Sequence, residues 1–300
     1  SLATPSKDNA IDLATAVYVN VLGRKLVTDN PRIKTAVDQW RMEQGEETSL
    51  QSSLAKNQEL KDIVLSETPW VNEAESEAEQ KQMLATFFDA NTIDSRVAYA
   101  IKELGKLQNE DGSWSWYPGM KGNSNITVSV AEMLVRLNKN AGMQKETQAM
   151  LVKAMDYLSK ETAKLVEKLK EMEKKGQTVT FPGFTTLQIL YLNAISSTSQ
   201  PHNLTTSQPH IYLIELLKKD IKKQSIYEKA LTAIVLAKNG QQKNGGEYVE
   251  SLKQYTVFTE EQGRYYDTPR ANYSWRDYRI PTQVAALEAI SELNAADKKT

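Results

Sequence analysis

The chain has 300 residues, 40% hydrophobic and 25% charged, the composition of an ordinary folded protein. Its net charge is −1 at pH 7, so we expect no long-range attraction to nucleic acid or anionic lipid. Cysteine is absent, which excludes disulfides, thiolate nucleophiles and cysteine metal sites made from these residues. No apolar run is long enough to predict a membrane span.

Apolar residues recur at helical spacing along nearly the whole chain. Ile11, Tyr18 and Leu22 share one face of a first predicted helix. A second begins at Asn30, the expected N-cap, with Pro31 at the first helical position. Further helices are expected over residues 49–67, 72–89, 95–107, 126–137, 145–175, 184–196, 209–220, 225–240, 244–255 and 281–293.

The expected helix over 145–175 is the longest, and its apolar residues follow the alternating spacing of a helix-pairing seam. The seam consists of Leu151, Met155, Leu158, Thr162, Leu165, Leu169 and Met172. Strand-like alternation is confined to 177–181 and 255–259. We therefore predict an all-α fold of about eleven or twelve helices.

Short loops between the expected helices favour antiparallel helical hairpins. No repeat of solenoid length is present, so a closed ring of about six hairpins, an α/α toroid, is preferred to a linear stack. No long Gly/Ser linker interrupts the chain, which predicts one domain over residues 1–300. The chain begins without methionine, and we expect it to be excised from a larger protein.

An aromatic connector, LQNEDGSWSWYPGMKG, separates two of the predicted helices. Gln108, Gly112 and Trp114 in it resemble the QW motif of the α/α toroids of terpenoid cyclases and protein prenyltransferases. In that motif the glutamine and the aromatic residue lock one helix end against the next hairpin. Trp114 would bury up to about 250 Å² there, and Gly112 would permit the tight turn. Trp116 and Pro118 follow in the same connector.

A second aromatic patch runs over residues 263–283 and also leads into a helix. It includes Tyr273, Trp275 and Gln283, and it is interpreted as a matching corner elsewhere in the ring. Structural packing is the simpler interpretation of the aromatic residues in both patches. A surface that binds a partner or a ligand is the alternative.

Three segments, over residues 53–89, 107–137 and 272–290, occur in an order that resembles the thioester-containing helical domain of bacterial α2-macroglobulin family proteins. ETPW with its following glutamates and the W-x-W-x-P-G turn are the specific parts. The resemblance extends from about residue 9 to the C-terminus. It implies a domain of a larger periplasmic or cell-surface protease inhibitor, with macroglobulin-like β-domains of the same chain as neighbours and proteases as targets.

The family's reactive members carry Cys-x-Glu-Gln just before the first core helix, and its cysteine and glutamine form a thioester. The equivalent segment here is expected within residues 5–20, which contain no Cys, Glu or Gln. Asp8 and Asn9 stand at the degenerate thioester position. The resemblance therefore implies a non-catalytic domain that lacks a thioester, so that any restraint of a protease would be steric.

A carbohydrate-binding or carbohydrate-active toroid is the alternative function, because Glu110 and Asp111 lie beside aromatic residues, as in many sugar sites. Adjacent acids in a turn are more often solvated. No Asp-rich motif of terpenoid cyclases occurs. His202 and His210 are expected to have surface or capping roles, because their spacing does not favour a zinc site. We predict no metal, no cofactor, no nucleic-acid partner and no membrane insertion by this segment.

Overall fold

The computed structural model describes residues 5, 7–43, 83–142, 145–196, 207–219, 224–267 and 279–294. The chain divides into two compact units, Ser1–Lys153 and Ala154–Thr300. The expected helix over 49–67 and most of that over 72–89 lie outside the described residues. The organisation of residues 1–300 as one domain stays a prediction.

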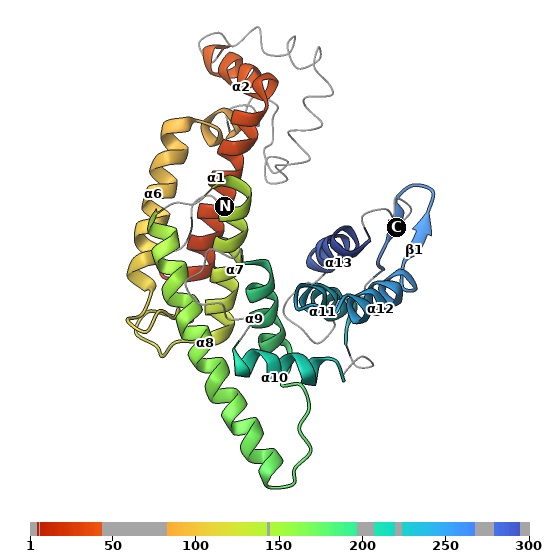
Figure 1. The fold of residues 1–300 in the computed structure, drawn as a ribbon. Coiled ribbons are helices and arrows are strands. Elements are labelled where there is room, and N and C mark those ends of the chain that lie inside the picture. The colour runs from red at the N-terminus through yellow and green to blue at the C-terminus, as the bar shows by residue number, and fades with distance from the viewer. Residues whose placement is uncertain are drawn as a thin grey trace. The chain divides into compact units, whose positions relative to one another are not determined.

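The first unit is built around α1, which packs against α6 and α7 (Figure 1). The helices whose bounds the structure describes are α1 (Ala10–Asp29), α2 (Pro31–Glu43), α6 (Ala90–Leu107) and α7 (Ser124–Ala141), followed by the beginning of α8. The contact face of α1 includes the fully buried Leu13 and Val17. Alanines, among them Ala14 and Ala16, occupy further buried positions of α1 and let neighbouring helices approach closely.

A smaller core in the first unit joins α2 to residues 84–88. Val37 and Trp40 of α2 are buried with Phe87 and Phe88, whose rings meet edge to face at 4.9 Å between centroids. Asn30 directly precedes α2, at the predicted N-cap position, but its side chain serves α1 instead, since Nδ2 donates to Leu26 O at 2.9 Å.

The long helix α8 (Lys145–Lys174) begins in the first unit and continues into the second. It matches the predicted range of 145–175 to within one residue. Along its predicted seam Leu151, Leu158 and Leu169 are buried. Met172, at the far end of the seam, is exposed.

In the second unit α11 is the central helix, because it packs against α9, α12 and α13 (Figure 1). Besides the end of α8, the described helices are α9 (Phe184–Ile195), α10 (Gln208–Leu217), α11 (Ile226–Lys238), α12 (Gln242–Lys253) and α13 (Arg279–Leu293). Residues 229–236 of α11 are all buried. Gly245 lets α12 come close, since a Cβ there would lie 2.8 Å from Ala233 O of α11.

The sheet within the described residues is one antiparallel hairpin of β1 (Val257–Thr259) and β2 (Gly263–Tyr265). It confirms the strand predicted within 255–259. The strand predicted over 177–181 is wrong, because residues 177–183 connect α8 to α9 without regular structure. No described strand lies beside them to complete a ladder, and Pro182 has no N–H to donate.

The all-α fold class is confirmed, and the described helices are consistent with the predicted α/α toroid. Within the described part of the chain, no helix has both the length and the apolar character needed to cross a bilayer.

Candidate functional site

The aromatic corner, residues 108–123, joins the end of α6 to the start of α7. Gln108 is the C-cap residue of α6. Its side-chain Nε2 donates to Gly112 O at 2.9 Å and to Met150 O of α8 at 2.8 Å. One amide group therefore holds the turn and, 42 residues further along the chain, the backbone of a third helix.

Gly112 lies at the closest approach of this turn to α8. Its φ is +90°, and a Cβ there would lie 2.2 Å from Lys153 O and 2.5 Å from Lys153 C. Both the backbone conformation and the space therefore require glycine. Asp111 Oδ1 accepts from Ser113 N at 3.0 Å and from Ser113 Oγ at 2.6 Å, which fixes the following residue.

Trp114 is completely buried between the two helices that the corner joins. Its indole Nε1 donates to Leu104 O in the last turn of α6 at 3.1 Å. Its backbone N donates to Thr127 Oγ1 in the first turn of α7 at 2.9 Å, and its O accepts from Asn123 N. Trp114 thus fixes the end of one helix to the start of the next.

The other aromatic residues of the corner point outward. Trp116 is 41% exposed, and Tyr117 and Met120 are more exposed still. Pro118 is exposed as well. The corner therefore divides into a buried lock, centred on Trp114, and an exposed aromatic loop over residues 116–120.

The second patch has a glutamine clamp of its own. Gln283 in α13 accepts from Tyr266 N at 3.1 Å through Oε1 and donates to Tyr266 O at 2.6 Å through Nε2. Tyr266 is buried, and burial raises the pKa of its hydroxyl above the usual value while Lys253 acts in the opposite direction. Tyr273 and Trp275 lie outside the described residues.

At the predicted thioester position, Asn9 is the N-cap of α1. Its Oδ1 accepts from Ile11 N at 2.9 Å and from Asp12 N at 3.2 Å. Both Asp8 and Asn9 are exposed. Asn9 therefore has a structural explanation in the capping of α1.

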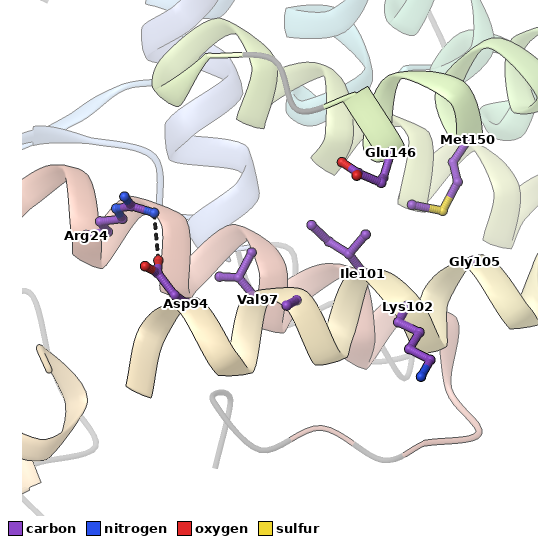
Figure 2. Close-up of a pocket in the computed structure, with 9 residues that line it drawn as sticks. Arg24, Asp94, Val97, Ile101, Lys102, Gly105, Glu146 and Met150 are labelled. Carbon is purple, nitrogen blue, oxygen red and sulfur yellow. Dashed lines mark hydrogen bonds and ion pairs between the residues drawn. The ribbon is translucent and has the colours of Figure 1, made fainter. Parts of the chain in front are cut away.

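A groove of about 600 Å³ in the first unit is lined by α1, α6 and the start of α8 (Figure 2). Val97 and Ile101 lie along its floor, and Met150 lies at the opposite wall (Figure 2). At one end Arg24 Nη1 contacts Asp94 Oδ1 at 2.6 Å, with both side chains more than half exposed. Such an exposed pair contributes little to stability. Because it is paired with Arg24, the carboxylate of Asp94 already has a partner at this end of the groove.

The acids and histidines singled out in the sequence form no reactive cluster in the described residues. Asp111 is bound by Ser113, and Glu110 is exposed. His210 is buried instead of lying on the surface, and its Nε2 is 2.9 Å from Asn239 Oδ1. Burial lowers the pKa of His210, and the hydrogen bond to Asn239 partly opposes that effect. His202 lies outside the described residues.

In the described ranges no cluster of three or more His, Asp or Glu side chains could hold a metal ion.

A family model of the A-macroglobulin TED domain matches residues 80–291, which is more than half of the chain. The chain belongs to the A-macroglobulin TED domain family. The predicted resemblance to the thioester-domain region of α2-macroglobulin proteins is thereby confirmed. The matched range of this TED domain begins after residue 79, whereas the predicted resemblance began at about residue 9. A search of curated proteins finds no match for the chain.

The sequence did not reveal the backbone partners of the TED domain's corner. Met150 O and Lys153 O are main-chain groups of α8, so their side chains carry no signal of the contact. Thr127 was detectable in principle, because it lies one turn beyond the Asn123 cap of α7. The capping role of Asn9 was also readable from its place before the apolar face of α1.

Proposed function

We propose that the chain is a non-catalytic structural and interaction domain of a bacterial α2-macroglobulin-like protease inhibitor that lacks a thioester. Membership of the A-macroglobulin TED domain family supports the type of domain. The proposed lack of a thioester rests on the absence of cysteine from all 300 residues, since a thioester needs a cysteine sulfur. Asn9, where the reactive segment was expected, caps a helix instead.

Without covalent capture, restraint of a protease has to be steric. The domain would then act as a rigid body that changes position after a bait segment elsewhere in the full protein is cleaved. The buried lock around Trp114 supports rigidity, because its indole and backbone groups bind two helices at once. We further propose neighbouring macroglobulin-like β-domains as intramolecular partners, and the periplasm or cell surface as the location.

Intact mass spectrometry tests the absence of a thioester. A thioester forms with loss of ammonia, and methylamine opens it to give an amide and a free thiol. We expect the mass of the domain to equal the sequence mass, both before and after methylamine treatment. A deficit of one ammonia, or a methylamine adduct, would show that covalent chemistry has been retained.

Protease assays with the full-length protein test steric restraint. A sterically enclosed protease should still cleave a small chromogenic peptide but should lose activity on a large protein substrate. Treating the inhibitor with methylamine beforehand should change neither activity, and no SDS-resistant adduct should form. If both substrates are cleaved at the free-enzyme rate after bait cleavage, the inhibitor role is wrong although the family membership stands.

The exposed loop over residues 116–120 favours a second candidate, a carbohydrate-binding domain. Tyr117 is 67% exposed and Trp116 lies beside it, and exposed aromatic rings can stack on sugars. A glycan-array screen of the domain and of Tyr117→Ala separates the two functions. Specific glycan binding that Tyr117→Ala abolishes would favour the carbohydrate function, and we expect none.

A further inference from the structure

A buried lysine in the second unit has only neutral partners. Lys229 of α11 is 8% exposed. Its Nζ donates to Ser251 Oγ of α12 at 3.1 Å and to Tyr255 OH at 3.4 Å. In the described residues it forms no ion pair, although buried ammonium groups are usually paired with carboxylates.

Tyr255 packs against this ammonium group and is itself partly exposed. The ring centroid is 4.4 Å from Lys229 Nζ, and Tyr255 is 52% exposed. One half-exposed side chain therefore supplies both a hydroxyl and an aromatic face to the cation, and a ligand that displaced this side chain would approach Lys229 Nζ.

A second cation with a neutral partner lies on the hairpin that follows Tyr255. Arg264 of β2 donates through Nη1 to Thr256 Oγ1 at 3.1 Å. Arg264 pairs with Phe258 in the β1–β2 register, so the two side chains share a face of the hairpin. Phe258 is 65% exposed, which places apolar surface beside the guanidinium.

We propose that the hairpin-base surface, formed by Lys229, Ser251, Tyr255, Phe258 and Arg264, binds an acidic segment of a partner protein. A carboxylate of that segment accepts from Lys229 Nζ and from the hydroxyl groups of Ser251 and Tyr255. A second carboxylate pairs with Arg264, and an intervening apolar side chain covers Phe258. This proposal does not depend on protease inhibition.

Charge decides the class of ligand. Lys229 and Arg264 lie on separate elements, α11 and β2, so one carboxylate matches each cation, whereas a phosphate group with a charge near −2 at Lys229 alone would leave excess negative charge there. The nearby acids do not satisfy the two cations. Glu250 pairs with Lys253, and in the described residues neither Glu260 nor Glu261 of the hairpin turn forms an ion pair with Arg264.

Fluorescence anisotropy with a labelled peptide tests the proposal. The probe is an N-acetylated, C-amidated heptapeptide that alternates valine with glutamate, and its control carries glutamine in place of glutamate. We expect the glutamate peptide to bind, and the glutamine peptide to bind at least about tenfold more weakly, as the loss of a charge-assisted hydrogen bond implies.

Three variants should weaken binding of the glutamate peptide, and one should not. Lys229→Met removes the buried charge at similar length, and we expect a loss of about tenfold or more. Tyr255→Phe and Arg264→Gln should each cost a few-fold, about 3-fold to 10-fold. Lys243→Met, at an exposed lysine of α12, should leave affinity unchanged.

Folding is checked by thermal unfolding of every variant. If Lys229→Met does not fold, Tyr255→Phe and Arg264→Gln decide the outcome. The proposal is overturned if the glutamate peptide fails to bind at millimolar concentration, if both peptides bind equally, or if the folded variants bind like the parent. Binding of phosphatidylglycerol vesicles without peptide binding would assign the cations to a lipid surface and overturn it too.

Discussion

Gln108 in the first unit and Gln283 in the second hold two corners of the molecule with different hydrogen-bond geometry. Gln108 donates twice from Nε2, to carbonyl groups on two separate segments. Gln283 donates once and accepts once, and both bonds go to the backbone of Tyr266. The first clamp therefore joins the end of α6 to α8, whereas the second fixes one residue against α13.

The buried aromatic residues at the two corners also differ in whether their polar atoms have hydrogen-bond partners. Trp114 Nε1 has a backbone acceptor in Leu104 O, whereas the buried hydroxyl of Tyr266 has no hydrogen-bond partner in the described structure. A buried polar atom without a partner costs free energy. At the first corner the buried indole N–H therefore has its hydrogen bond, whereas at the second corner the buried hydroxyl of Tyr266 lacks one and is unfavourable.

Removing the indole at the first corner should have the largest effect. Trp114→Ala should lower the free energy of unfolding by about 3–5 kcal/mol, because it deletes a fully buried ring and leaves a cavity. Denaturant unfolding measures the loss. Trp116→Ala, at the exposed end of the same corner, is the matched control and should cost less than about 1 kcal/mol. Equal losses would contradict the division of the corner into a lock and an exposed loop.

A methyl group at Gly112 should have the next largest effect. Gly112→Ala should cost about 2–4 kcal/mol, from strain at positive φ together with the collision with Lys153 O. Gly119→Ala is the control, since Gly119 also has positive φ but no atom within 4 Å of the added methyl. Thermal unfolding of the two variants separates strain from collision. A loss for Gly119→Ala as large as that for Gly112→Ala would mean that strain alone matters.

Glutamate substitutions should distinguish the two clamps. Gln108→Glu loses both donated bonds and places a carboxylate against two carbonyl oxygens, so we expect a loss of about 2–3 kcal/mol. Gln283→Glu keeps the bond from Tyr266 N and should cost about 1 kcal/mol. Denaturant unfolding at pH 7 gives both values. The reverse order would contradict the donor and acceptor assignments of the two amides.

Removing the hydroxyl at the second corner should have a small effect in the favourable direction. Tyr266→Phe should leave stability unchanged or raise it by up to about 1 kcal/mol, because the ring stays and only a buried polar atom without a partner is lost. Thermal unfolding measures the change. Destabilisation by more than about 1 kcal/mol would imply that the hydroxyl has a stabilising partner.

Histidine protonation should change the stability of the second unit only, because both histidines belong to it. The pKa of His210 is lowered in the folded state, so the unfolded chain binds the proton more readily. Stability should therefore fall as pH drops below about 6.5, the ordinary pKa of histidine. Unfolding from pH 7.5 to 5.5 should show a shallower pH dependence in His210→Gln than in the parent. A slope in His210→Gln as steep as the parent's would contradict the assignment of the effect to His210.

Local signals in the sequence predicted the helices well. The apolar spacing of α8 placed its two ends to within one residue, because a long periodic helix depends little on its neighbours. The alternation over 255–259 predicted β1, and the same kind of alternation over 177–181 failed. The two segments differ in that β1 has β2 nearby in the chain to pair with, whereas 177–181 has no strand beside it among the described residues.

The sequence by itself determined the helical class, the place of the aromatic lock, and the absence of the thiol that a thioester requires. These depend on residue type and on spacing along the chain. The tertiary structure decided that Gln108 reaches Met150 O, that Gly112 faces Lys153 O, and that Lys229 is buried among hydroxyl groups. Backbone acceptors and buried cations of this kind are set by which helices pack together, and a main-chain carbonyl looks the same at every position of the sequence.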